Sequence, residues 1–187
     1  GYYDEGPAIT SQHGFIYDGT TYTSLTYPGA PTTGMGAGTW AGGISGNNIV
    51  GAYGDISGDG HAFLYDGTTW TTLDAPWAES GPTGKTVTQA FDIDDTSIVG
   101  SYTDSAHNSH GSLYHGTGWT PLTYPGAIQT WVLGVSGNSL VGQLVDSSGD
   151  VHGFLYNGGT WTPLDYPGAI WTAANGIDGN RIVGAYA

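Results

Sequence analysis

A seven-residue pattern that begins with histidine occurs four times along this chain of 187 residues. The four copies begin at His13, His61, His110 and His152, at spacings of 48, 49 and 42 residues. Periods of this length indicate one supersecondary unit per repeat, stacked on its neighbours to bury a shared core. We therefore expect a single domain, residues 1–187, built of four repeats.

Each repeat contains four short stretches that favour β-strands, which we name A, B, C and D in chain order. In the second repeat, A begins at His61, B begins at Trp70, C ends at Ile93 and D begins near Ile98. The A-to-B and most C-to-D links carry Gly with Asp or Asn, residues that suit the positive φ of tight hairpins. The B-to-C link is the longest in the first two repeats, so it should join separate sheets.

Four-stranded antiparallel units of this length are typical of propeller blades, so we expect an all-β, four-bladed β-propeller. A blade would run C-D-A-B from the axis outward, with the Gly- and Ala-rich C strand in the crowded centre. Residues 13–28 would supply A and B of one blade and residues 171–187 its C and D, so the terminal strands would close the ring as a two-plus-two clasp. Gly1–Asp4 shares the register of Gly184–Ala187, which leaves open a boundary within a longer tandem array or an end that reaches a neighbouring molecule.

Composition excludes several classes of function. Sixteen acids against two bases give a formal charge of −14, which argues against nucleic-acid binding because phosphates attract clustered Lys and Arg. The chain has no Cys and therefore no disulfide or thiolate metal site. No apolar run approaches the roughly 20 residues that span a bilayer, so we expect no membrane insertion. The first residue is Gly rather than Met, which is expected after removal of a leader or a larger parent and equally of an excerpt from a longer sequence. The chain has two sites for tryptic cleavage, Lys85 and Arg181, which suits a protease-exposed setting outside the cell.

The sequence His61-Ala-Phe-Leu-Tyr-Asp-Gly, with a Leu-x-Tyr-Pro-Gly-Ala turn and an Ile-Val-Gly-x-Tyr strand, resembles the HAF-type probable extracellular repeat of bacteria. The likeness covers essentially the whole chain. It implies a secreted or cell-surface tandem-repeat protein, and it supplies no catalytic residues. Three departures, Ala75-Pro-Trp at the turn, Ser112 for Phe and His115 for Asp, disfavour a role that needs four identical pockets.

Aromatic side chains gather on the face that should carry the B-to-C links, beside the carboxylates of Asp55, Asp59, Asp146 and Asp150. Aromatic rings next to polar groups suit a sugar, whose C–H groups stack on the rings while its hydroxyls bond the polar groups. The alternative, packing between blades, carries more weight for any single ring. The candidate ligand-binding residues are Tyr27, Trp40, Trp77, Tyr124, Trp131, Tyr166 and Trp171.

A weak calcium candidate lies in the D-to-A link, where Asp55, Ser57 and Asp59 stand at positions 1, 3 and 5 of a partial calcium-loop pattern. The twelfth position, Asp66, falls at the far end of a strand, roughly 20 Å away at about 3.3 Å per residue. A plain hairpin turn is the preferred interpretation, so we expect no cofactor besides this calcium candidate. The recurring His is interpreted as a hydrogen-bonding bridge between strand and loop rather than as a metal ligand.

Catalysis is not expected. The chain has only two glutamates, Glu5 and Glu79, and Asp92, Asp94 and Asp95 should stay solvated at a C-to-D hairpin. We expect a structural, self-associating module of the extracellular surface or matrix that forms filaments with other copies of itself or with neighbouring repeats. The alternative is a lectin-like propeller that binds glycans weakly at several sites.

Overall fold

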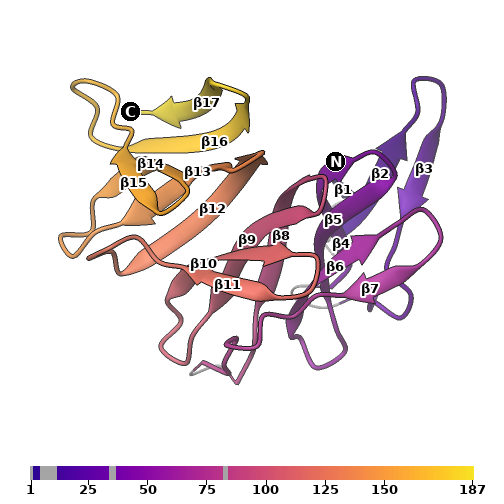
Figure 1. Ribbon diagram of the computed structural model, residues 1–187. Helices are drawn as coiled ribbons and strands as arrows, with labels where there is room; N and C mark the ends of the chain where they lie inside the picture. The colour runs from indigo at the N-terminus through magenta and orange to yellow at the C-terminus, as the bar shows by residue number, and fades with distance from the viewer. Residues whose placement is uncertain (1, 5–11, 34–36, 82–83) are drawn as a thin grey trace.

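The computed structural model describes residues 2–4, 12–33, 37–81 and 84–187, and within these ranges the chain is all-β (Figure 1). Seventeen strands form five antiparallel sheets. The first sheet is β1 (Tyr2–Asp4), β2 (Gln12–Tyr17) and β3 (Tyr22–Leu25), and the second is β4 (Thr39–Ser45), β5 (Asn48–Gly54), β6 (Gly60–Tyr65) and β7 (Trp70–Thr72). The third is β8 (Thr88–Asp94), β9 (Ser97–Thr103), β10 (Ser109–His115) and β11 (Trp119–Leu122); the fourth is β12 (Gln129–Ser136), β13 (Ser139–Val145), β14 (Val151–Asn157) and β15 (Thr160–Pro163); the fifth is β16 (Thr172–Asp178) and β17 (Arg181–Tyr186).

The three complete sheets have the predicted strand order. Each consists of neighbouring strands C, D, A and B in that sequence, as in β4-β5-β6-β7. The D and A strands pair in the same register in every complete sheet; Tyr53 opposes His61 and Leu144 opposes His152. The prediction of four-stranded antiparallel units, with the B-to-C link joining separate sheets, is therefore confirmed.

The C strand of each complete sheet has a β-bulge at the same repeat position, and so does β16. In β4 the bulge lies between Ala41 and Gly43. A Cβ atom added to Gly43 would lie 2.7 Å from the Cα of Asp92 in the next sheet. A Cβ added to Gly134 would lie 3.0 Å from the Cα of Gly176. Successive C strands thus approach closely at the bulge, which explains the glycines at positions 43 and 134.

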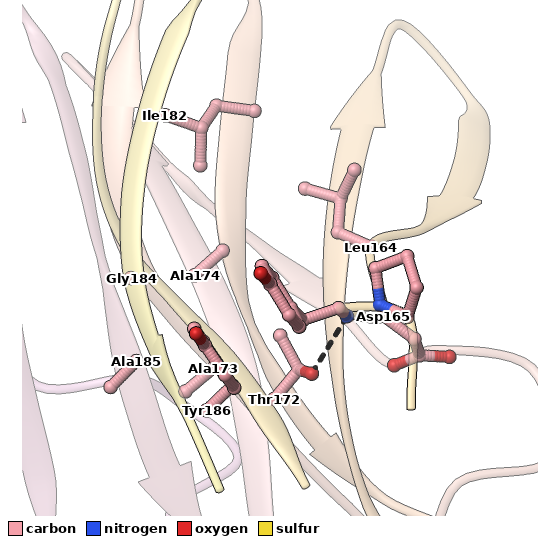
Figure 2. A pocket seen from close by; sticks show the side chains of 11 residues that line it. Leu164, Asp165, Thr172, Ala173, Ala174, Ile182, Gly184, Ala185 and Tyr186 are labelled. Atoms are coloured by element: carbon pink, nitrogen blue, oxygen red, sulfur yellow. Dashed lines mark hydrogen bonds between the residues drawn. The ribbon is translucent and has the colours of Figure 1, made fainter. Parts of the chain in front are cut away.

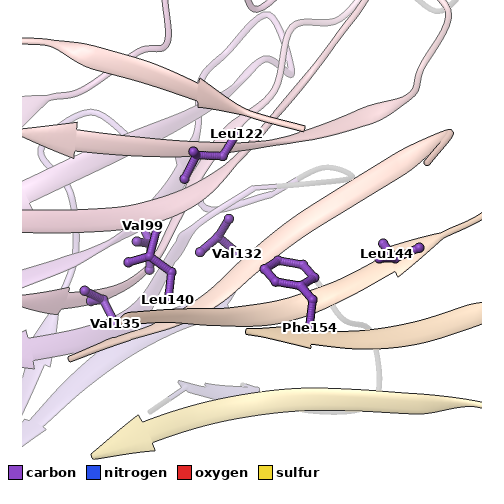
Figure 3. Close-up of a cluster of buried hydrophobic side chains, with 7 residues drawn as sticks. All are labelled: Val99, Leu122, Val132, Val135, Leu140, Leu144 and Phe154. Atoms are coloured by element: carbon purple, nitrogen blue, oxygen red, sulfur yellow. The ribbon is translucent and has the colours of Figure 1, made fainter. Parts of the chain in front are cut away.

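The hydrophobic core lies between sheets. We call the packing of one sheet on the next, together with the link between them, a joint, and we number the four joints from the N-terminus. Figure 3 shows the third joint, in which Val99 of β9 and Phe154 of β14 belong to one buried cluster. The other members of that cluster are Leu122, Val132, Val135, Leu140 and Leu144. A single sheet therefore has no core of its own and depends on its neighbours.

The sheets follow one another along an open arc, with the first and fifth sheets at its two ends (Figure 1). Strands β16 and β17 pair with each other, whereas β2 pairs with β1 and β3. Tyr3 of β1 opposes His13 in the same way as Tyr53 opposes His61. Strand β1 therefore pairs with β2 as the last residues of a D strand pair with an A strand. The predicted clasp between residues 13–28 and 171–187 is not formed in this structure, and the closed four-bladed ring stays a prediction.

Candidate functional site

The tyrosine of the Tyr-Pro-Gly-Ala turn is a packing element of the joint. The Tyr27 ring stacks on Tyr53, with centroids 3.6 Å apart and planes at 5°, and meets Trp70 edge-on at 5.3 Å. Its backbone N–H donates to Thr39 Oγ1 at 2.8 Å, and both tyrosine hydroxyls bond Thr72 Oγ1. Burial raises the pKa of Tyr53 to about 12. One face of the Tyr27 ring is thus covered by Tyr53 within the first joint.

The third joint repeats this arrangement. Tyr124 packs on Phe154 with centroids 6.2 Å apart and meets Trp161 edge-on at 5.2 Å, while its backbone N–H donates to Thr130 Oγ1 at 3.1 Å. Phe154 lies opposite Gly142 in the ladder of β13 and β14. The side chain missing from glycine provides room for the phenylalanine ring.

The second joint replaces both aromatic partners with small residues. The N–H of Ala75 donates to Thr88 Oγ1 at 3.3 Å, which places Ala75 where Tyr27 and Tyr124 stand in the other joints. Ser112 opposes Gly100, where Phe154 stands in the next sheet. The two departures from the repeat pattern therefore fall in the same joint, at positions whose equivalents in the first and third joints are aromatic rings that pack on each other. Trp77 of the same link packs instead on Tyr102, with ring centroids 5.8 Å apart.

Ser112 leaves a buried polar atom, and this predicts a stabilising substitution. Among the described residues, its Oγ has no hydrogen-bond partner, and the side chain is fully buried. Ser112→Ala should raise the free energy of unfolding by about 1 kcal/mol because a buried unpaired hydroxyl is costly. Thr130→Ala, which removes the acceptor of the Tyr124 N–H, should lower it by a similar amount. Urea denaturation of both variants measures the two effects, and a destabilised Ser112→Ala would contradict this prediction.

The fourth joint is incomplete and contains a pocket of about 420 Å³ (Figure 2). Tyr166 stacks on Tyr186, with centroids 3.7 Å apart and planes at 5°, and its N–H donates to Thr172 Oγ1 at 3.0 Å. These contacts match those of Tyr27 with Tyr53 and Thr39. The pocket lining is Leu164, Asp165, Tyr166, Pro167, Thr172, Ala173, Ala174, Ile182, Gly184, Ala185 and Tyr186. Within the described residues, the fifth sheet consists of β16 and β17 alone, so the pocket lies where Phe63 and Trp70 lie in the second sheet.

The seven predicted aromatic residues do not form one shared site. Tyr27, Tyr124 and Tyr166 occupy equivalent positions in the first, third and fourth joints, and Trp77 lies in the second joint. The three others lie along the C strands or just before one. Trp40 meets Phe91 edge-on at 5.8 Å, Trp131 opposes Gln143 in the β12–β13 ladder, and Trp171 precedes β16 and exchanges backbone hydrogen bonds with Ala187.

The recurring histidine bridges strand and loop, as the sequence predicts. His61 Nδ1 lies 2.9 Å from an Asp74 carboxylate oxygen, and His110 Nε2 lies 2.9 Å from Asp104 Oδ2. His152 contacts Asp165 in the same way as His61 contacts Asp74, with distances of 3.2 Å. The described residues contain no group of three or more His, Asp or Glu side chains placed to hold a metal ion.

The contact between His110 and Asp104 predicts a pH effect. The hydrogen bond from His110 lowers the pKa of Asp104 from its ordinary 3.8 to about 2. Because the folded-state pKa is depressed, the contribution of this carboxylate is present above pH 3.8 and is lost as the pH falls toward about 2. Between these pH values, the wild type should lose stability more steeply than Asp104→Asn, which cannot titrate. Thermal melts across this range measure the difference, and parallel curves would contradict it.

The D-to-A link of the second sheet is a turn stabilised by its own carboxylates. Asp55 Oδ1 accepts hydrogen bonds from the N–H groups of Ser57 and Asp59 at 2.8 and 2.9 Å. Asp59 Oδ1 accepts the N–H of Thr86 at 2.7 Å. A calcium ion would have to compete with these donors for the same oxygens, and calcium binding stays a prediction.

One acidic residue predicted to be solvated is half-buried. Asp92 lies at the bulge of β8, where its Oδ2 accepts the N–H of Val135 in the next sheet at 3.0 Å, and burial raises its pKa. The expectation of a solvated Asp92 is wrong because the carboxylate connects two C strands. The signal in the sequence is an acidic residue at a repeat position where the neighbouring sheets have glycine, Gly43 and Gly134.

A second connection between neighbouring sheets was not foreseen. In the three complete sheets, the last residue of the C strand accepts a backbone N–H from the next C-to-D turn. Ser45 Oγ accepts from Asp95 at 3.1 Å, Asp94 Oδ2 from Gly137 at 2.7 Å, and Ser136 Oγ from Gly179 at 3.1 Å. The signal in the sequence is a Ser or Asp at the same repeat position. We call this contact the turn bridge.

Comparison with models of protein families and with curated proteins gives no match for this chain. The resemblance to the HAF-type repeat therefore stays a prediction. Within the described residues, no helix has the length and apolar character needed to cross a membrane.

Proposed function

We propose that this protein is a non-catalytic structural module of the extracellular surface or matrix, which associates with other copies of itself through the kind of joint that holds its own sheets. The observation that carries the proposal is the incomplete fourth joint. Its stacked Tyr166 and Tyr186 border an unfilled, largely apolar pocket, whereas the equivalent places in the first and third joints hold Phe63 and Phe154. Exposed apolar surface of this kind favours association.

The four-stranded sheets in C-D-A-B order support a propeller-like relation between neighbours. If the first and fifth sheets of one chain merged, the result would be the four-bladed ring with the terminal clasp. The same surfaces can instead join separate chains. Repetition of a head-to-tail contact then gives an open assembly unless its rotation closes a ring.

Glycan binding receives less support from the geometry. Stacking on a sugar needs an open ring face, but the rings of Tyr27 and Tyr124 pack within joints. Trp77 and Trp171 are more exposed but lie in different links. We therefore place self-association ahead of the lectin-like alternative. The extracellular location proposed here rests on the resemblance and on composition.

Sedimentation velocity over a range of protein concentrations tests the proposed function. Because each copy carries a charge of −14, the measurement needs salt near 0.15 M, where the Debye length is about 8 Å. The average mass should rise above 19.3 kDa with increasing concentration. A single species of 19.3 kDa at every concentration would overturn self-association.

A further inference from the structure

We infer that the fifth sheet takes the β2–β3 hairpin of a second copy, with β17 replacing β1 beside β2. The result would be a four-stranded sheet in the order β16-β17-β2-β3, the C-D-A-B order of the three complete sheets. The inference rests on the proposed function and names the two surfaces that meet. Four kinds of contact support it, each present inside the chain and each incomplete at the two chain ends.

The first is the backbone ladder. In the second sheet, Gly51 opposes Phe63 and Tyr53 opposes His61. The same register would place Gly184 of one copy opposite Phe15 of the next, and Tyr186 opposite His13. Strand β1 covers only the first half of β2, from Gln12 to Gly14. The six-residue β17 could therefore first pair with the second half of β2 and then displace the three-residue β1.

The second contact is the aromatic cluster. Phe15 meets Tyr22 at 5.4 Å, and Tyr17 meets Tyr22 at 4.5 Å. The equivalent pairs in the second sheet, Phe63 with Trp70 and Tyr65 with Trp70, have distances of 4.9 and 4.5 Å. The hairpin thus already holds its rings in the arrangement found in a complete sheet. Tyr22 is 70% exposed, and docking would bring this cluster against Tyr166 of the first copy.

The third contact joins an aliphatic residue of the D strand to one at the end of the next C strand. Val50 and Ile93 are buried in one cluster, and Val99 and Val135 are buried in another. At the chain ends the equivalent residues are exposed. Val183 of β17 is 68% exposed and Ile44 of β4 is 61% exposed. In the proposed assembly, Val183 would be covered by Ile44 of the second copy.

The fourth contact is the turn bridge. Asp178 ends β16 at the position of Ser45, Asp94 and Ser136, which each accept an N–H from the following C-to-D turn. Gly46 holds the first turn position, which Asp95 and Gly137 occupy in later sheets. Asp178 of one copy is therefore expected to accept the N–H of Gly46 of the second copy.

A second copy satisfies these contacts more readily than the same chain does. The first and fifth sheets lie at opposite ends of the arc (Figure 1), so closure within one chain would require the existing joints to change their packing. A second copy needs only one further joint of the observed kind and the release of the short β1. The segment that docks on the fifth sheet is thus the β2–β3 hairpin of another chain.

Cysteine cross-linking between two singly substituted proteins tests this assignment, and the chain has no natural Cys to interfere. In the second sheet, Val50 of the D strand opposes Leu64 of the A strand. The equivalent residues are Val183 in β17 and Ile16 in β2, so these two should oppose each other in the assembly. Val183→Cys mixed with Ile16→Cys should form a disulfide-linked dimer under mild oxidation. The control is Ile56→Cys, which lies in the exposed D-to-A link and should give no such dimer with Ile16→Cys.

Charge substitutions give a second readout that needs no cross-link. Val183→Lys should reduce association by at least tenfold because docking would bury the ammonium group. Ile56→Lys makes the same change of charge at an exposed residue outside the joint and should leave association unchanged. Both variants should keep the wild-type melting curve of the isolated chain.

The outcomes separate this inference from the proposed function. If the wild type associates but Val183→Lys associates equally well and the mixed cysteine variants do not link, the inference is overturned while self-association stands. If the wild type remains a monomer and the double variant Val183→Cys/Ile16→Cys forms an internal disulfide, the chain closes on itself and both proposals fail.

Discussion

Gly142→Ala should lower the free energy of unfolding by about 3 kcal/mol, because no room exists for even one methyl group at this position. A Cβ atom there would lie 1.9 Å from the carbonyl oxygen of Trp131 and 2.8 Å from the Phe154 ring. Both neighbours are fixed, one as backbone of the adjacent strand and the other as the centre of the third joint. Urea denaturation followed by tryptophan fluorescence measures the loss.

The matched control is Gly118→Ala. A Cβ atom at Gly118 meets no other atom within 4 Å, and its φ lies outside the positive range that favours glycine. Its effect should stay within about 0.5 kcal/mol. Equal stabilities for the two variants would mean that strands β12 and β13 do not approach as closely as the structure has them.

Phe154→Ala should cost about 3–5 kcal/mol, whereas Phe15→Ala should cost about 1 kcal/mol or less in the separated chain. The two residues hold the same position in the repeat, but only Phe154 is fully buried, since Tyr124 and Trp161 pack against it. Phe15 belongs to a sheet without a preceding joint. Urea denaturation at low protein concentration compares the two variants.

The effects of these two substitutions on self-association should have the opposite order to their effects on stability. Phe15→Ala removes the ring expected to enter the pocket beside Tyr166, so it should weaken self-association strongly. Under conditions in which the Phe154→Ala protein remains folded, its self-association should stay near the wild-type level. A Phe15→Ala protein that associates as well as the wild type would argue against the role of the hairpin.

The repeat pattern predicted the three complete sheets well because the information that specifies a sheet is local. Turn residues such as Gly46 and Gly137, both at positive φ, set the hairpins, and His61 is the second residue of its A strand. Ring closure depends instead on the rotation between neighbouring sheets. That rotation comes from side-chain packing such as Phe91 against Trp40, which periodicity does not reveal.

The candidate site was predicted in part. Sequence reasoning selected Tyr27, Tyr124 and Tyr166 as a set, and they are equivalent in the structure. It could not separate packing from ligand contact, because both require an aromatic ring at the end of a strand. That the two exceptional residues, Ala75 and Ser112, fall in the same joint becomes visible only when the joints are compared in space.

Negative-stain electron microscopy of the wild-type protein at a concentration where it associates is the most direct measurement of the central idea, that one chain completes the last sheet of another. We predict elongated particles of varying length, which disappear in Val183→Lys and persist in Ile56→Lys. Uniform compact discs of single-chain size, unaltered by either substitution, would contradict it.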